Sequence, residues 1–444
     1  MKKTLLFILL LLCIFFTAVA EKYEQVPAVF AMQVQTEERK QNNNESFVYK
    51  EYLITSNAQV NTAIAERVDA FDSLYASQLQ ADPKKQGHKN SRLEIGVVYY
   101  RTGEHYVSTL VFARQMFQKQ VVGFDFNTVL YNLKTGQSVA LSEILAEDSQ
   151  ADFLLQVQKQ ISALYPNQGV NAEALQSFVQ NVDALPFTMS AMELTIHLPE
   201  KELFAGKNAI AHARFYYPQL SFSDTGINIA DNGKWKFVAL SFDDGPKDPQ
   251  SFSTLQAMRK VGGRMNYFFV GKQMEPFGYV LPIQMSENHL LGNHTMQHWS
   301  GYSMKTFERR RKELTDVDAI TLELVGEKAR YFRAPGGTYP PWAEADIGLP
   351  IIQWSVDTYD YTGKPRKRIF YSVRDNVKDG DIVLMHDTGF QTHLAIPLIG
   401  EWLTQNGYYM VTLDELAAAY GVQPLANEVY WSFREGEDRS TKQE

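Results

Sequence analysis

Residues 237–246 read Phe-Val-Ala-Leu-Ser-Phe-Asp-Asp-Gly-Pro, and this stretch decides the fold predicted for the second half of the chain. Its four leading apolar residues predict a short buried strand that ends just before Asp243 and Asp244. Asp248 is predicted to cap the helix that follows. Further strand patterns alternate with helical patterns, at 267–270, 351–354, 382–385 and 409–412. Repeated strand–helix units predict a parallel sheet, open or closed as a barrel.

Polar side chains gather where four of the predicted strands end. The clusters are Asp243-Asp244, Arg333-Ala334-Pro335-Gly336-Gly337, Asp357 with Asp360, and His386-Asp387. The carboxyl ends of parallel strands meet on one face, and chemistry in such folds sits beyond that face. We therefore expect these clusters to lie together. An aspartate pair before Gly-Pro is by itself more typical of a turn.

Two histidines complete a candidate metal site. His294 and His298 are four residues apart, so on a helical turn both imidazoles would point to the same side. Together with one carboxylate of the Asp243–Asp244 pair, they offer three ligands and leave one position open for water, as in hydrolytic sites. Imidazoles favour zinc over magnesium, with cobalt, manganese and nickel as alternatives. The residues alone do not decide which aspartate binds the metal.

A hydrolase also needs a base for the attacking water and an acid for the leaving group. The second carboxylate of the aspartate pair is placed to act as the base. His386, distant in sequence but at a strand end, is the candidate acid, and Asp360 is expected to orient it. Arg333 is expected to pair with the base and keep it ionised. The structural alternatives are a core histidine for His386 and a surface ion pair for Arg333.

Five segments, in this order, resemble the motifs of the polysaccharide deacetylases, family 4 of the carbohydrate esterases. They are Ser241-Phe-Asp-Asp-Gly-Pro246, His294-Thr-x-x-His298, Arg333-x-Pro-x-Gly337, Asp357-x-x-Asp-Tyr361 and Leu384-x-His386. Residues 267–271 and 411–416 resemble a strand and the closing segment of the same family. The resemblance covers residues 235–432. It implies a distorted (β/α) barrel that carries a metal-dependent amidase acting on N-acetylated sugars.

The resemblance also implies a role for each residue of the site. The metal ligands would be Asp244, His294 and His298. Asp243 would be the base, and Arg333 would hold it in place. His386 would be the acid, and Asp360 would orient it. Thr295 would brace the loop between the ligand histidines, and Leu384 would line the acetyl pocket. The oxyanion would be held by the metal and by the backbone N–H that follows Pro335.

Two positions depart from the family pattern, and both would line the substrate groove. Gly336 stands where the family usually has tyrosine, and Tyr361 stands where it usually has tryptophan. The backbone donor at Gly336 survives the change. The departures therefore leave the predicted reaction intact but put the length and identity of the bound sugar in doubt.

The first twenty residues predict a secretory signal. Lys2 and Lys3 precede an apolar run, 4–16, that is shorter than the roughly 20 residues of a membrane span. Ala18-Val19-Ala20 supplies a small-residue cleavage pattern. We expect cleavage after Ala20 and a secreted or envelope-associated protein, with an uncleaved membrane anchor as the alternative. Cys13, the only cysteine, would leave with the signal, so core burial rather than disulfides must stabilise the mature chain.

Residues 23–222 predict a smaller α+β domain ahead of the barrel domain at 235–432, and residues 433–444 predict a polar tail. Apolar residues at helical spacing predict a helix with Val60, Ile64, Val68, Phe71 and Leu74 on one face. The alternation at 93–99 predicts a half-buried strand. Residues 127–145 resemble a domain found ahead of bacterial cell-wall deacetylases and in the ectodomains of some anti-sigma factors. Its histidines lack ligand-like spacing, so no chemistry is predicted there.

The charge balance argues against a nucleic-acid partner. The chain carries 43 Lys and Arg against 51 Asp and Glu, a formal charge of −8, and has no long basic run. The sequence as a whole predicts an exported deacetylase that removes acetyl groups from N-acetylglucosamine in peptidoglycan or a related polysaccharide. Chitin-type oligosaccharides, N-acetylmuramic acid and O-acetyl xylan are alternative substrates. A catalytically inert envelope sensor that binds glycan or lysozyme is the alternative from another class.

Overall fold

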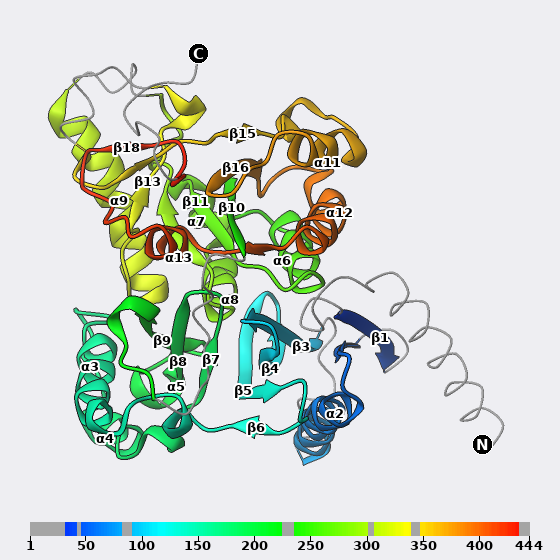
Figure 1. Cartoon of the computed structure of the whole chain (residues 1–444). Helices are drawn as coiled ribbons and strands as arrows, with labels where there is room; N and C mark the ends of the chain where they lie inside the picture. The colour runs from blue at the N-terminus through cyan, green and yellow to red at the C-terminus, as the bar shows by residue number, and fades with distance from the viewer. Residues whose placement is uncertain are drawn as a thin grey trace.

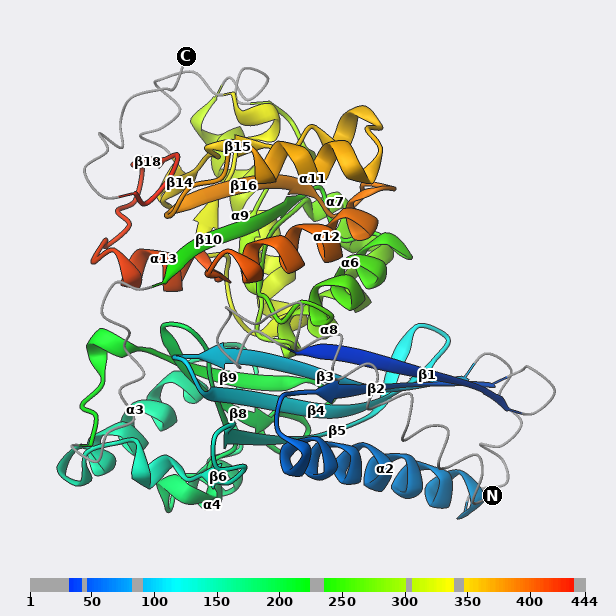
Figure 2. The same ribbon diagram turned by 45° about the vertical axis from the view of Figure 1, so that its right-hand side comes forward.

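The computed structural model describes residues 32–41, 46–81, 91–223, 235–300, 306–338 and 347–434. The predicted signal at 1–20 and nearly all of the predicted tail lie outside these residues. In both overall views the barrel lies above two N-terminal sheets (Figures 1 and 2). Within the described part of the chain, no helix is both long enough and apolar enough to cross a bilayer.

The first N-terminal sheet has six strands in sequence order. They are β1 (Gln33–Gln41), β2 (Ser46–Ile54), β3 (Ser91–Thr102), β4 (Tyr106–Phe117), β5 (Gln120–Asn132) and β6 (Ser138–Val139). Only β2 and β3 pair in parallel, because helix α2 (Ala58–Ala81) carries the chain back between them. The predicted helix is confirmed, but Leu74 is 42% exposed and Tyr75 takes its place in the core. Tyr75 follows Val68 by seven residues, two helical turns, and so shares its face.

The second N-terminal sheet is antiparallel and packs against short helices. Its strands are β7 (Phe187–Met189), β8 (Glu193–Pro199) and β9 (Ile210–Tyr216). The helices around it are α3 (Gln150–Ser162), α4 (Ala172–Phe178) and α5 (Glu200–Leu203). The apolar stripe of α3, formed by Phe153, Val157 and Ile161, packs into the core of this sheet.

The barrel is a nine-stranded sheet in which every strand pair is parallel. Its strands are β10 (Lys236–Asp243), β11 (Met265–Phe269), β12 (Leu290–Asn293), β13 (Tyr331–Phe332), β14 (Ile351–Ile352), β15 (Val356–Asp357), β16 (Asp381–His386), β17 (Tyr408–Met410) and β18 (Val429–Tyr430). The order is β15-β16-β10-β11-β12-β13-β14-β18, with β17 beside β10. A bridge between Asp381 and Ser432 brings the segment after β18 back to β16. The sheet therefore curls towards closure, as the distorted barrel predicts.

Helices surround the barrel sheet (Figure 1). They are α6 (Gln250–Arg259), α7 (Gly271–Phe277), α8 (Leu281–Ser286), α9 (Phe307–Val325), α11 (Arg366–Arg374), α12 (Thr392–Gln405) and α13 (Leu413–Ala419). The prediction that Asp248 caps the first of these was wrong. Pro249 is the cap residue of α6, and the Asp248 carboxylate instead accepts a hydrogen bond from Tyr279 at 2.6 Å and pairs with Lys119 at 3.1 Å. Strand β18 was not predicted, since it pairs for only two residues.

A buried network of charges joins the barrel to the six-stranded sheet. The Arg259 guanidinium contacts Glu94 at 2.8 Å, and Glu51 and Glu287 at 3.0 Å each. Arg114 adds contacts of 3.2 Å to both Glu94 and Glu287. All five side chains are almost wholly buried. Strand β3 is therefore covered by α2 on one side and by the barrel on the other, and the prediction of a half-buried strand was wrong.

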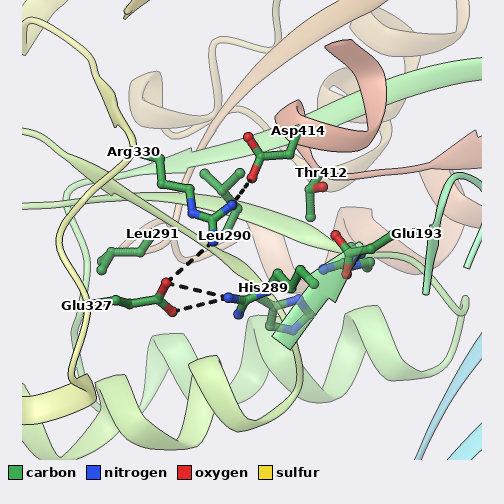
Figure 3. A pocket seen from close by; sticks show the side chains of 10 residues that line it. Glu193, His289, Leu290, Leu291, Glu327, Arg330, Thr412 and Asp414 are labelled. Atoms are coloured by element: carbon green, nitrogen blue, oxygen red, sulfur yellow. Dashed lines mark hydrogen bonds and ion pairs between the residues drawn. The ribbon is translucent and has the colours of Figure 1, made fainter. Parts of the chain in front are cut away.

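A second group of charges lies where the barrel meets the three-stranded sheet (Figure 3). Arg330 contacts Asp414 at 2.7 Å, and Arg214 reaches Glu327 at 3.4 Å. These residues line a cavity of ≈ 10 Å³, room for about one water molecule. His289 Nδ1 accepts a hydrogen bond from a backbone N–H, so its Nε2 carries a proton. Both charge groups lie at the amino ends of the barrel strands, before β11, β12 and β13.

Candidate active site and metal centre

Strand β10 ends at the first of the two aspartates, and the two carboxylates point to different partners. Asp243 is the last residue of the strand and is buried, whereas Asp244 has left-handed backbone geometry, with φ of 71°. That turn rotates the Asp244 carboxylate towards the histidines. Gly245 permits a close approach at the same turn, because a Cβ there would lie 2.5 Å from an Asp387 oxygen.

The two candidate ligand histidines lie in a loop after β12, and the prediction of a helical turn was wrong. Thr295 and His298 both have positive φ, 67° and 56°, which no helical turn contains. The loop folds back so that the ring centres of His294 and His298 lie 5.1 Å apart. Asn293 stabilises the loop by accepting a hydrogen bond from the Thr295 N–H at 2.9 Å. The spacing of four residues thus brings the imidazoles together through loop geometry.

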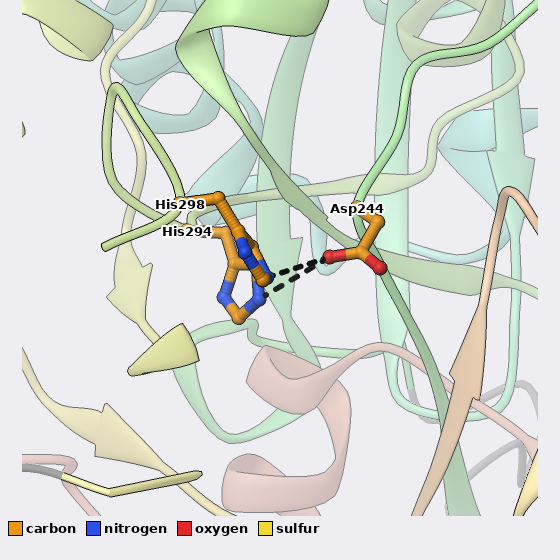
Figure 4. Close-up of side chains that lie close together, drawn as sticks. All are labelled: Asp244, His294 and His298. Carbon is orange, nitrogen blue, oxygen red and sulfur yellow. Dashed lines mark ion pairs between the residues drawn. The ribbon is translucent and has the colours of Figure 1, made fainter. Parts of the chain in front are cut away.

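Asp244, His294 and His298 form a group suited to a metal ion, and Figure 4 shows both rings facing one carboxylate oxygen. Within the described residues, they are the one group of three such side chains whose ligand atoms lie within 4.8 Å of one another. Asp244 Oδ1 lies 3.0 Å from Nε2 of His298 and 3.6 Å from Nε2 of His294. That oxygen is buried and makes no hydrogen bond of good geometry. Lone pairs that converge without directed hydrogen bonds fit a cation held between them.

The protonation states of two of the three side chains suit a metal, whereas the hydrogen-bonding contact with Asp244 raises the pKa of the third, His298. His294 Nδ1 donates to the Arg333 carbonyl at 2.8 Å, which leaves the Nε2 lone pair facing the group. Burial lowers the pKa of His294, so this imidazole is held neutral. Burial alone would raise the pKa of Asp244, but the imidazoles of His298 and His294 outweigh it and bring it to about 2. One anionic oxygen and imidazole nitrogens are ordinary zinc ligands.

Arg333 anchors the other aspartate. Its guanidinium is wholly buried and pairs with Asp243 Oδ1 at 2.8 Å. It also donates to the Ser241 hydroxyl at 2.8 Å and stacks on the Phe268 ring at 4.1 Å. The other Asp243 oxygen lies 3.7 Å from His294 Nε2. The carboxylate is therefore fixed beside the metal-binding group, as expected of a base.

His386 and Asp360 form the pair that the sequence predicted. His386 Nδ1 contacts Asp360 Oδ1 at 2.7 Å, and the His386 backbone N–H donates to Asp360 Oδ2 at 2.8 Å. Thr392, which opens α12, donates to Asp360 Oδ2 at 2.6 Å and was not predicted. Burial lowers the pKa of His386, but the hydrogen bond and charge of Asp360 outweigh it and raise that pKa to about 9. The imidazole is thus held protonated, with Nε2 free to donate.

Asp360→Asn is expected to shift the pH profile of activity. If His386 is the acid catalyst, activity falls as the pH rises through its pKa, because an acid catalyst works only while protonated. Removing the Asp360 charge lowers that pKa, and the alkaline limb of kcat/KM should move to lower pH by at least about one unit. The rate of hydrolysis measured from about pH 6 to about pH 10 tests this. An unmoved limb would show that Asp360 does not control the His386 proton.

The three residues predicted to contact substrate differ in how deeply they are buried. Leu384 is buried and lies two residues before His386 on β16, so both side chains share one face of the strand. The exposed ring of Tyr361 meets the His386 ring edge-on, with centroids 5.1 Å apart. A Cβ built at Gly336 would meet no atom of the described residues within 4 Å. Within that part of the chain, the space beside Gly336 is therefore open, where the family usually has a tyrosine ring.

Neighbouring strands bring the proposed base and acid together. Asp243 and His386 occupy paired positions at the ends of β10 and β16. The metal-binding group, a tethered carboxylate and a protonated imidazole thus share the carboxyl face of the barrel. This arrangement supports metal-assisted hydrolysis, in which one group takes a proton from water and another gives one to the leaving group.

Comparison with known proteins agrees with this chemistry. A family model described as polysaccharide deacetylase matches residues 230–347. A peptidoglycan-N-acetylglucosamine deacetylase of Bacillus cereus is 31% identical over 189 residues, which cover 41% of this chain and 88% of that protein. The peptidoglycan-N-acetylglucosamine deacetylase PgdA of Listeria monocytogenes is 30% identical over 181 residues, 41% of this chain. The peptidoglycan-N-acetylmuramic acid deacetylase PdaC of Bacillus subtilis is 26% identical over 181 residues, also 41% of this chain.

This chain belongs to the polysaccharide deacetylase family. The match spans only 39% of the Listeria protein's own length and 38% of the length of the Bacillus subtilis protein. All three relatives match over about two fifths of this chain.

Proposed function

We propose that this protein is a metal-dependent deacetylase that hydrolyses N-acetyl groups of N-acetylglucosamine residues in peptidoglycan or a related envelope polysaccharide. One observation carries the proposal: the ligand group, the tethered carboxylate and the protonated imidazole all lie on one face of the barrel. An inert sensor would not need these three parts together. Two of the relatives are peptidoglycan-N-acetylglucosamine deacetylases, which supports the choice of polymer.

In this proposal each side chain has one task. Asp243 takes a proton from the attacking water, and its pairing with Arg333 keeps the carboxylate in position. His386 gives a proton to the amine nitrogen as it leaves, because an amine leaves poorly unless protonated. Asp360 orients the imidazole through its contact of 2.7 Å. Acetate and a free sugar amine are the products.

Asp244, His294 and His298 would hold the metal, and two imidazoles with one carboxylate favour zinc, with cobalt, manganese and nickel as alternatives. When bound, the metal supplies a Lewis acid for the acetyl oxygen and lowers the pKa of water. The backbone N–H of Gly336 would donate to the developing oxyanion. Leu384 would contact the acetyl methyl group. The proposal also places the protein outside the cytoplasmic membrane, secreted or associated with the envelope, where its polymer is found.

Metal removal tests the proposed function. Chelator-treated protein is expected to lose nearly all acetate release from peptidoglycan and to regain it with zinc. Without the metal, the ligand side chains Asp244, His294 and His298 do not lower the pKa of water. Magnesium is the control and should not restore activity, since it binds imidazole poorly. Parallel assays on chitooligosaccharide and acetyl xylan decide between the polymers. Absence of acetate release from every polymer, with each metal supplied, would instead favour the inert glycan- or lysozyme-binding sensor.

A further inference from the structure

Two positively charged side chains lie on exposed aromatic rings beside the site. The Arg309 guanidinium stacks 4.1 Å from the centre of the Trp299 ring, and the Lys364 ammonium lies 4.2 Å from that of Tyr359. Both rings are at least one-third exposed. Trp299 directly follows the candidate ligand His298. Tyr359 directly precedes Asp360, so the two pairs come from different loops of the barrel.

Contacts connect each pair to the reacting groups. On one side, the Tyr359 ring lies 6.2 Å from Tyr361, whose ring lies 5.1 Å from that of His386. On the other side, His298 Nε2 lies 3.0 Å from the Asp244 carboxylate, and Trp299 follows it in the chain. The Lys364 pair therefore borders the acid side of the site. The Arg309 pair borders its metal-binding side.

The Lys364 ammonium acts electrostatically on the nearby Asp357 carboxylate, but neither Lys364 nor Arg309 is held in an ion pair within the described residues. Arg309 and Lys364 have no ion pair there, in contrast to two other exposed cations of the barrel. Lys312 pairs with Asp316 at 2.6 Å and Arg374 pairs with Asp375 at 2.7 Å. A cation that lies over an aromatic face is held in place by that face. Two available charges are thus fixed at the borders of the site in a chain of net charge −8.

We infer that the Arg309–Trp299 and Lys364–Tyr359 pairs bind carboxylates on the sugar units next to the one that loses its acetyl group. This rests on the proposed function and specifies its substrate class as an anionic glycan rather than a neutral one. Guanidinium binds carboxylate through two parallel hydrogen bonds, and ammonium binds it as a point charge. In peptidoglycan, the carboxylate belongs to a peptide stem or, after its removal, to the lactyl group of the sugar.

The test compares full-length, metal-loaded wild type with Arg309→Gln/Lys364→Gln. The substrates are peptidoglycan strands with peptides, the same strands stripped of peptides, and neutral chitooligosaccharide. We expect the ratio of kcat/KM on anionic strands to kcat/KM on the neutral oligosaccharide to fall about 2- to 30-fold, the range for two exposed charge contacts. A fall on only one of the two anionic strands identifies the peptide or the lactyl group as the source of the carboxylate.

The matched control is Lys312→Gln/Arg374→Gln, which removes two exposed cations that already have acidic partners. It should leave that ratio unchanged. Raising the ionic strength from about 0.01 M to about 1 M should lower the wild-type ratio, because the Debye length shrinks from ~30 Å to ~3 Å. An equal effect of both double variants, or a ratio that neither substitution nor salt alters, would overturn the inference.

A binding measurement separates this inference from the proposed function. If the wild type releases acetate from none of the polymers, the proposed function fails, but retention of each polymer on immobilised protein still tests the carboxylate contacts. Stronger retention of anionic strands that salt weakens, and that Arg309→Gln/Lys364→Gln abolishes, supports the inference. Equal retention of anionic and neutral polymers rejects it.

Discussion

Asp243→Asn is expected to lower acetate release by roughly 10²–10⁴-fold, the usual contribution of a positioned acid or base. The Asp243 carboxylate is fixed by Arg333 at 2.8 Å, and its other oxygen lies beside His294 without belonging to the metal-binding group. Asparagine keeps the shape of the side chain but cannot accept a proton. Metal content by elemental analysis should therefore remain intact, and excess metal should not restore the rate.

Asp244→Asn is the matched comparison, because it makes the same chemical change one residue along the chain. It removes the anionic oxygen that faces both His294 and His298. Metal should then bind weakly, and added metal should restore part of the activity. Metal loss in Asp243→Asn with full occupancy in Asp244→Asn would reverse the two roles. Unchanged acetate release in both variants would eliminate the deacetylase proposal.

Arg259→Met is expected to lower the free energy of unfolding by about 3–5 kcal/mol, the cost of leaving buried charges without their partner. Arg259 contacts Glu51, Glu94 and Glu287 at 2.8–3.0 Å, and all four side chains are almost wholly buried. Arg114, and Arg92 at 3.9 Å from Glu94, would remain to balance the three carboxylates, and neither pairs with Glu51. Denaturant unfolding followed by tryptophan fluorescence measures the loss.

Arg39→Met is the control for this prediction, since Arg39 makes an exposed ion pair with Asp72 at 2.9 Å. Such surface pairs contribute about 0–1 kcal/mol. A loss in Arg259→Met no larger than that in the control would mean that water reaches the carboxylates and the two parts of the chain separate readily. Uncoupled unfolding of the barrel would lead to the same conclusion.

The candidate site could be predicted from sequence because its side chains follow strand ends. Asp243 and His386 each end a strand of the parallel sheet, so the strand pattern and the residue type together predict that they lie near each other. Ser241 was missed, although it lies two residues before Asp243 and so shares its face. The contact of Thr392 with Asp360 could not be predicted, because 32 residues separate them and no motif links them. The histidine loop was predicted for the wrong reason, since positive φ values cannot be read from spacing.

The contact between the two parts of the chain could not be predicted. Arg259 and Glu51 are separated by 208 residues, and nothing in either local pattern indicates a partner. The alternation at 93–99 was therefore interpreted as a strand with one solvent face. Burial of the second face depends on the barrel, which arrives much later in the chain. Local patterns thus predicted the elements but not which surfaces meet.

The polarity of the barrel has a consequence for how this protein can change in evolution. The N-terminal sheets contact the amino ends of the strands, through Arg259 to Glu94, Glu287 to Arg114 and Arg330 to Tyr216. The reacting groups lie instead at the carboxyl ends. Loops at the carboxyl ends are free to diversify for new glycans without disturbing the junction. Residues at the amino ends must instead substitute in concert with partners in the other domain. Substitutions at the carboxyl ends of the strands can therefore alter substrate preference by themselves. Substitutions at the amino ends require a compensating substitution in the N-terminal sheets.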